Sequence, residues 1–106
     1  DGRCFPWGNR FDPTLCLMNE SREGNAAPET VCRFSTDRSV YGVQDLGGTM
    51  REWVTASAKA HEEHGVARGG SWYSSAKSVR LASRSTHYKH VVYSSIGFRL
   101  ACDLPG

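Results

Sequence analysis

Glycine and proline interrupt the first half of this 106-residue chain so often that a long helix cannot form there. They stand at Pro6, Gly8, Pro13, Gly24, Pro28, Gly42, Gly47 and Gly48. Loops and short strands are therefore expected in this half, with β-prone runs at Val40–Val43 and Glu52–Thr55. Further along, the residue patterns predict strands at Val66–Trp72, Val79–Ala82 and Gly97–Ala101. The polar run Ser57–His64 predicts a surface connection.

The length of the chain allows one domain with a single modest core. No apolar run is long enough to cross a bilayer, so we do not expect membrane insertion. The first residues hold neither an initiator methionine nor an apolar leader, so we expect the chain to begin inside a longer protein or after processing. The N-terminus therefore gives no indication of localisation.

Charge is unevenly distributed along the chain. Residues 67–102 hold six basic and no acidic side chains, while the rest holds seven basic against eleven acidic. A basic patch of this kind can attract nucleic acid. Because all the carboxylates lie outside this stretch, we expect its arginines to pair with them, and we do not expect a nucleic-acid partner. The pairs would join Arg80, Arg84 and Arg99 to acids such as Asp37, Asp45 and Glu52.

The four cysteines, Cys4, Cys16, Cys32 and Cys102, lie too far apart in sequence for a zinc knuckle. A disulfide between Cys16 and Cys32 is one alternative. Free and mostly buried thiols are the expectation, because the apolar content of the chain does not require a disulfide.

A serine- and tyrosine-rich segment follows Trp72 and runs to Ile96 without a single carboxylate. Tyrosine offers a large, stiff contact area and serine offers adaptable hydrogen bonds, the combination found in binding loops. Two glycine-containing blocks, Arg68–Trp72 and Ile96–Leu100, bracket the segment. This pattern favours a surface that binds a ligand by shape.

Five motifs in order give the chain a resemblance to the formylglycine-generating-enzyme (sulfatase-modifying factor) family. They are Phe5–Asn9, Tyr41–Leu46, Arg51–Trp53, Arg68–Trp72 and Gly97–Arg99. The resemblance implies an α+β fold similar to C-type lectins, loop-rich with small antiparallel sheets. It also implies that residues 1–106 form the C-terminal portion of the family domain and that a preceding helical portion lies outside this chain.

The family's enzymes bind copper through two cysteines shortly after the Gly-Gly-Ser-aromatic block, because the metal needs thiolate ligands. Here that stretch, Tyr73–Val79, contains no cysteine, so we predict that the chain does not make formylglycine and is not an enzyme. Another branch of the family uses histidine-bound iron. The pairs His61/His64 and His87/His90 have His-x-x-His spacing, which on a helix would suit a metal, but we expect exposed histidines without one.

Residues Arg68 to Leu100 also resemble the variable region of diversity-generating retroelement proteins. The invariant frame would be Trp72, Ala76, Arg80, Ala82, Arg84 and Ile96–Leu100. Between the frame positions lie residues reachable from an asparagine codon by changing adenines alone, and these are the predicted ligand-binding residues: Tyr73, Ser74, Ser75, Ser78, Ser83, Ser85, Thr86, His87, Tyr88, His90, Tyr93, Ser94 and Ser95. Lys77 and Lys89 are not reachable in this way. The resemblance implies a non-catalytic ligand-binding domain with a protein or glycan ligand.

Two other functions stay open for a chain with these motifs. One is a non-diversified sensor or scaffold module fused to a kinase or another signalling protein. The other is a metal-dependent oxidase of the family.

The segment Tyr41–Trp53 resembles a calcium site of the family. The resemblance assigns oxygen ligands to Asp45, Gly48, Met50 and Glu52, and oxygen is the donor that calcium prefers. The alternative is that Asp45 and Glu52 pair with arginines and bind no ion. A structural calcium is thus a candidate, and no cofactor is required.

Overall fold

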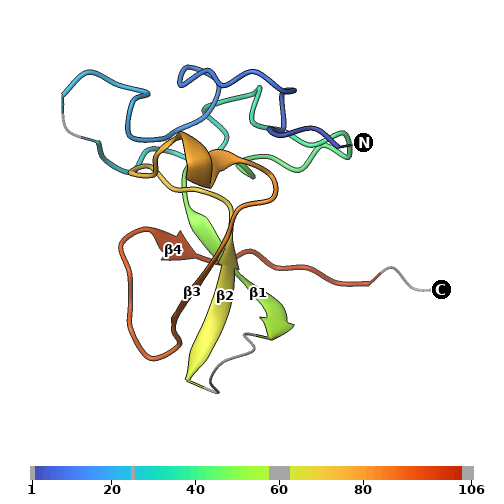
Figure 1. Ribbon diagram of the computed structural model, residues 1–106, viewed down its shortest axis with the longest axis vertical. Helices are drawn as coiled ribbons and strands as arrows, with labels where there is room; N and C mark the ends of the chain where they lie inside the picture. The colour runs from blue at the N-terminus through green and yellow to red at the C-terminus, as the bar shows by residue number, and fades with distance from the viewer. Residues whose placement is uncertain (1, 25, 58–62, 104–106) are drawn as a thin grey trace.

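The computed structural model describes residues 2–24, 26–57 and 63–103. Its regular elements are strands β1 (Arg51–Ser57), β2 (His64–Arg68), β3 (Arg84–Tyr88) and β4 (Ile96–Gly97), and a 3-10 turn, η1 (Ala76–Val79). The strands form one sheet in the order β3-β2-β1-β4. Figure 1 shows the loops of the first half together on one side of η1 and the strands on the other.

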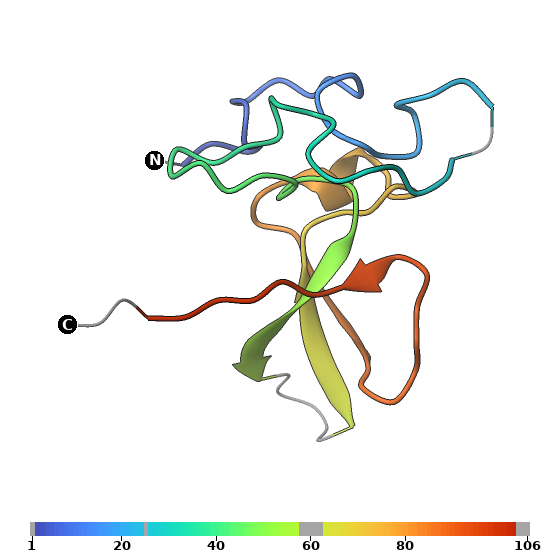
Figure 2. The ribbon, with the colours of Figure 1, turned by 180° about the vertical axis from the view of Figure 1, so that it is seen from behind.

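The sheet is mixed. Strand β2 pairs antiparallel with both β1 and β3, whereas β4 pairs parallel with β1 through Arg51 opposite Ile96 and Glu52 opposite Gly97. Among the described residues, one mixed sheet therefore takes the place of the expected small antiparallel sheets. Parallel neighbours need a long connection. Here that connection includes β2, η1, β3 and the loop before β4, which swings out beside the sheet in Figure 2.

Several strand predictions need correction. Val79–Ala82 is wrong as a strand, because Val79 ends η1 and the chain then turns toward β3. The strand predicted at Gly97–Ala101 stops at Gly97, and β2 ends at Arg68 rather than Trp72. The run Val40–Val43 is not a strand either, because Val40 and Tyr41 lie in a turn and the next two residues are irregular. Of the predicted connection Ser57–His64, the two ends lie in β1 and β2, and residues 58–62 fall outside the described part.

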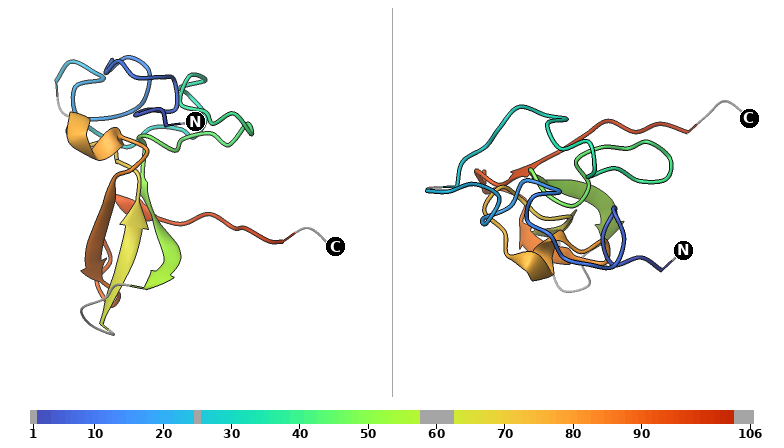
Figure 3. Two further views of the ribbon diagram at one scale, coloured as in Figure 1. Left: turned by 45° about the vertical axis from the view of Figure 1, so that its right-hand side comes forward. Right: turned by 90° about the horizontal axis from the view of Figure 1, so that it is seen from above.

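The first half is loop-rich, as its glycines and prolines predict, and it packs around a small apolar core. Phe5, Cys16, Met18 and Val79 are buried there, and Trp7 packs against them. Val79 comes from η1, so this turn ties the second half of the chain to the loops. Both views in Figure 3 place η1 beside the loop layer. Among the described residues η1 is the only helical element, so the α part of the predicted α+β class is small.

A buried carboxylate organises the loop that leads into β1. Asp37 is fully buried, and its two oxygens accept the N–H groups of Gly47 at 2.7 Å and Gly48 at 2.9 Å. Burial raises the pKa of this carboxyl, while the two N–H donors act in the opposite direction. Gly48 must be glycine, because a Cβ there would lie 2.2 Å from the carbonyl oxygen of Leu17.

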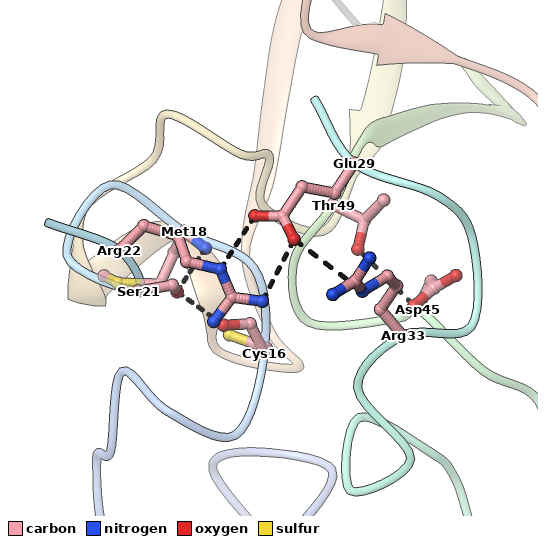
Figure 4. Close-up of polar contacts among 8 residues, drawn as sticks. All are labelled: Cys16, Met18, Ser21, Arg22, Glu29, Arg33, Asp45 and Thr49. Atoms are coloured by element: carbon pink, nitrogen blue, oxygen red, sulfur yellow. Dashed lines mark hydrogen bonds and ion pairs between the residues drawn. The ribbon is translucent and has the colours of Figure 1, made fainter. Parts of the chain in front are cut away.

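Polar contacts join the loops at the surface (Figure 4). Glu29 accepts two hydrogen bonds from the Arg22 guanidinium and lies 3.9 Å from Arg33. Ser21 accepts from the Met18 N–H and donates to the Cys16 carbonyl, which closes a compact turn. None of the helices formed by the described residues is long and apolar enough to span a membrane.

Candidate ligand-binding surface

The start of the serine- and tyrosine-rich segment is fixed by two glycines. Gly69 has a φ of +84°, and a Cβ there would lie 2.8 Å from the Leu46 carbonyl oxygen. A Cβ on Gly70 would lie 2.7 Å from the Val79 side chain and 2.8 Å from the Gly47 carbonyl oxygen. Both positions therefore require glycine, which explains the Gly-Gly pair before the segment.

Trp72 connects the start of the serine- and tyrosine-rich segment to the loop between β3 and β4. Its main-chain N–H donates to the Thr49 carbonyl, and its indole N–H donates to the main-chain carbonyl of Ser94 at 3.1 Å. The Arg51 N–H donates to the Ser95 carbonyl at 2.9 Å. The loop before β4 is thus attached through main-chain oxygens, and these bonds do not depend on which side chain stands at either serine position.

Ser74 differs from its neighbours because it is buried, with 4% of its surface exposed. Its Oγ accepts the Ser71 N–H at 2.8 Å, lies 3.1 Å from the Ser71 Oγ and 3.4 Å from an Arg51 guanidinium nitrogen. The structure therefore places this predicted ligand-binding residue inside the turn that precedes η1. The next residue, Ser75, is exposed.

Strand β3 carries part of the segment, and its side chains alternate between the two faces of the sheet. Pairing with β2 sets one face, made of Trp53, Gly65, Ala67, Ser85 and His87, which we call the histidine face. The other carries Glu52, Val54, His64, Val66, Arg68, Arg84, Thr86 and Tyr88, and we call it the arginine face. The predicted ligand-binding residues of β3 consequently do not form one surface.

An aromatic cluster covers the histidine face. The His87 ring lies 5.2 Å from the Tyr93 ring and 6.2 Å from the Trp53 ring, measured between centroids. Its Nε2 is 2.7 Å from the Ser85 Oγ. Burial, with a smaller contribution from the charge of Arg51, lowers the pKa of His87. The structure thus brings together Ser85, His87 and Tyr93, three of the predicted residues.

The remaining predicted residues differ in exposure. Tyr73 and Tyr88 are 64% and 52% exposed, respectively. Thr86, His90 and Ser94 are also exposed. Ser78, Ser83 and Ser95 are partly buried. Apart from Ser74, the predicted set therefore lies at or near the surface, with members on both sides of the sheet.

The predicted arginine pairs form in one case of three. Arg99 donates to both oxygens of Glu52, at 2.5 Å from Nε and 2.6 Å from a terminal nitrogen. Arg80 instead donates to the Lys77 carbonyl. Within the described residues Arg84 has no ion-pair partner.

The arrangement around Asp45 and Glu52 does not fit a calcium ion. Both Glu52 oxygens accept from Arg99, and the same guanidinium donates to the carbonyl oxygens of Gln44 and Asp45. Asp45 Oδ2 accepts the Cys32 N–H, and the Gly48 carbonyl accepts the Met50 N–H. Of the four predicted ligands, Glu52 thus has both oxygens bound to a cationic side chain, while the Gly48 carbonyl and one Asp45 oxygen already accept main-chain N–H groups.

The histidines are not arranged as helical metal ligands. His61 lies outside the described residues, while His64 stands on β2. His87 stands on β3 and His90 in the turn after it, so this pair does not share a helix face. Within residues 2–24, 26–57 and 63–103 no three His, Cys, Asp or Glu side chains group as a metal site.

The four cysteines are free thiols, as expected, but three of them are exposed. The expectation of mostly buried thiols is therefore wrong, and only Cys16 is buried. Burial raises the pKa of this thiol to about 12, so it stays protonated at neutral pH and is a poor metal ligand or nucleophile.

A cleft that the sequence did not predict lies beside the Glu52–Arg99 pair. It has a volume of about 610 Å³ and is lined in part by Val31, Cys32, Val43 and Phe98. Phe98 is 75% exposed, because the chain after β4 runs away from the body of the protein (Figure 1).

Residues 1–104 match the model of the FGE-sulfatase family, the sulfatase-modifying factor enzyme 1-like domain. The chain belongs to this family. It is 26% identical over 114 residues to the inactive C-alpha-formylglycine-generating enzyme 2 of Bos taurus, an alignment that covers 94% of this chain. The alignment covers 38% of that relative, so the chain spans less than half of its length.

A crystal structure of CarF has the same fold, with a TM-score of 0.66 and 21% identity over 89% of this chain and 36% of that one. Sequence reasoning missed β3, whose serines and histidine read as a loop. From Arg84 to Tyr88 exposed and partly buried residues alternate strictly, but this alternation arises from the pairing of the segment with β2 and is not visible in its residue types.

Proposed function

We propose that this chain is a non-catalytic ligand-binding domain, the C-terminal portion of a C-type-lectin-like variable protein diversified by a retroelement. Its recognition surface would consist of the exposed positions between Tyr73 and Ser95. The observation that carries the proposal is how the loops are held. Trp72 and Arg51 bind the main-chain oxygens of Ser94 and Ser95, so side chains at these positions can change while the loop keeps its path.

Tyrosines would supply most of the affinity. Tyr73 is largely exposed and packs its ring 5.4 Å from the Trp72 ring, which holds it without burying it. Tyr93 is braced in the same way by His87. A rigid aromatic side chain loses little conformational entropy on binding, and this property makes tyrosine effective in recognition loops. The ligand would be a protein or a glycan.

Three observations support the absence of catalysis. The segment Tyr73–Val79 lacks cysteine, the buried Cys16 thiol has a strongly raised pKa, and the related bovine protein is named inactive. Copper and iron titrations, combined with oxygen consumption in the presence of a cysteine-containing peptide, test this part. Stoichiometric metal uptake with turnover of the peptide would establish the oxidase instead.

Diversification is tested at the locus. We expect sibling copies to differ at adenine-derived positions such as Tyr73, Ser75, Tyr93 and Ser94. Trp72 and Gly97 should not vary. A neighbouring reverse transcriptase and a template repeat differing only at adenines are also expected. Substitutions spread evenly over frame and intervening positions would refute diversification.

One observation favours the second candidate, a non-diversified sensor or scaffold module. Ser74 belongs to the adenine-reachable set, yet its hydroxyl is committed to buried hydrogen bonds. A display library randomised at Ser74, with a matched library at Ser75, separates the two candidates. Loss of folded protein in both libraries would favour a fixed module, whereas a Ser75 library that folds would favour a diversified surface and restrict any loss to the structural position 74.

A further inference from the structure

The arginine face carries two facing positive charges. Arg68 and Arg84 are directly opposite one another in the antiparallel pairing of β2 with β3, and both are exposed. Side chains at such positions have Cβ atoms about 4.5–5.5 Å apart, and like charges there repel. Arg68 reaches the Leu81 carbonyl at 3.5 Å, and neither arginine has a carboxylate partner within the described residues.

Arg68 and Arg84 share a row across the sheet with one carboxylate, Glu52 on β1, and this carboxylate is already paired. Glu52 is opposite Arg68 on β1, but both of its oxygens accept from Arg99. Two guanidinium groups in the row, and that of Arg99 from beyond β4, therefore surround one carboxylate. Exposed arginines present planar forks of donors that match carboxylates in a bidentate geometry. Carboxylates supplied from outside the chain would relieve the repulsion between Arg68 and Arg84.

Beyond this row the arginine face carries no Asp, Glu, Lys or Arg side chain. Thr86 offers an exposed hydroxyl, and Val54 and Tyr88 offer exposed apolar surface. A ligand that fits the face would place carboxylates over Arg68 and Arg84 and apolar side chains over Val54 and Tyr88. We propose that this face binds an acidic peptide segment of a protein partner.

Nucleic acid fits the face less well. Proteins that bind it through its backbone commonly make on the order of six to ten phosphate contacts. Only two guanidinium groups are free of a carboxylate here, and Glu52 borders them. The proposal goes beyond the diversified surface, because Arg84 belongs to the predicted invariant frame and Arg68 precedes Trp72, where that frame begins.

The experiment titrates the labelled chain with a capped peptide of alternating glutamate and valine. A peptide of alternating glutamine and valine is the matched control, and oligothymidylate is the competing probe. NMR signals of β2 and β3 amides and arginine side-chain N–H groups report the site. We expect the glutamate peptide to shift the signals of Arg68, Arg84 and Thr86, and added salt to weaken the effect.

The substitution R84Q should weaken binding of the glutamate peptide by about 10-fold or more, because charge-assisted hydrogen bonds contribute roughly that factor. R68Q should act in the same direction and serves as a second variant if one of them folds poorly. K77Q is the control, because it removes an equal charge from exposed η1. Far-UV circular dichroism of each variant checks the fold.

Three outcomes would overturn the proposal. They are equal binding of the glutamate and glutamine peptides, equal weakening by K77Q and R84Q, and tighter binding of oligothymidylate than of the glutamate peptide. A locus without adenine-directed variation would refute the proposed diversification and leave this result unchanged. The two proposals can therefore fail separately.

Discussion

The contact between Arg99 and Glu52 allows a test of whether the segment Tyr41–Trp53 can bind calcium. In the wild-type chain the Arg99 guanidinium binds both Glu52 oxygens and the carbonyl oxygens of Gln44 and Asp45. We expect calcium to leave the thermal unfolding of this chain unchanged. The substitution R99Q removes the cation and releases the oxygens, so calcium should stabilise the variant.

The magnitudes follow from the geometry. The Arg99 side chain is 39% exposed, which weakens its ion pair through solvent screening, so R99Q alone should lower the free energy of unfolding by about 1–2 kcal/mol. A ligand present at about ten times its Kd stabilises the folded state by about 1.4 kcal/mol. For a domain of this size that corresponds to a rise in Tm of roughly 6–11 °C.

Thermal unfolding of both proteins, with calcium and with a chelator, is the assay. Magnesium is a control, because it demands a tighter octahedral site than calcium. A wild-type Tm that rises with calcium as much as that of R99Q would refute the reasoning, since the guanidinium would then not exclude the ion. Equal insensitivity of both proteins would show that the released oxygens do not form a site.

Three further predictions concern the buried Ser74, the four cysteines and the partly buried His87. S74A should lower the free energy of unfolding, measured by urea denaturation, by about 1–3 kcal/mol, because it leaves the Ser71 N–H without its acceptor. S75A at the exposed neighbour is the control and should change this free energy by less than about 0.5 kcal/mol. Equal effects of the two substitutions would contradict the buried role of Ser74. Iodoacetamide at mildly alkaline pH should label the three exposed cysteines rapidly and Cys16 only when the protein unfolds. Mass spectrometry measures the labelling of each cysteine. Rapid labelling of Cys16 in the folded protein would contradict its burial and its raised pKa. The lowered pKa of His87 favours its neutral form in the folded state, so its contribution to stability is complete above its unfolded pKa of about 6.5 and is lost as the pH falls through the folded pKa. H87Q should therefore flatten the dependence of the unfolding free energy on pH in this range. A slope equal to that of the wild-type chain would exclude the effect.

The parts of the fold that sequence could predict are those set by local backbone chemistry. Glycine and proline spacing predicted a loop-rich first half, and the β-prone run Glu52–Thr55 predicted a strand that lies within β1. The glycine-containing block before the serine- and tyrosine-rich segment was recognised in the sequence, and the structure shows the carbonyl oxygens that leave no room for a Cβ at Gly69 and Gly70. The Arg99–Glu52 pair was also among the predicted combinations.

The parts that sequence could not predict depend on contacts between distant residues. Strand β3 forms because residues 84–88 pair with β2, and only Thr86 and Tyr88 among them are typical strand formers. Burial of Ser74 depends on Ser71 and Arg51, so its composition-based assignment to an exposed surface could not distinguish it from Ser75. Phe98 was expected inside a strand because of alternation, yet the chain leaves the sheet after Gly97.

The pairing of β3 with β2 has a consequence for how this segment can evolve. Along residues 84–88 the parity of a residue number decides which side of the molecule a substitution alters. An odd position modifies the neighbourhood of Trp53, and an even position modifies the neighbourhood of Arg68. Any process that rewrites this short stretch of codons therefore edits two back-to-back surfaces at once, and selection acting on one of them leaves the other free to drift.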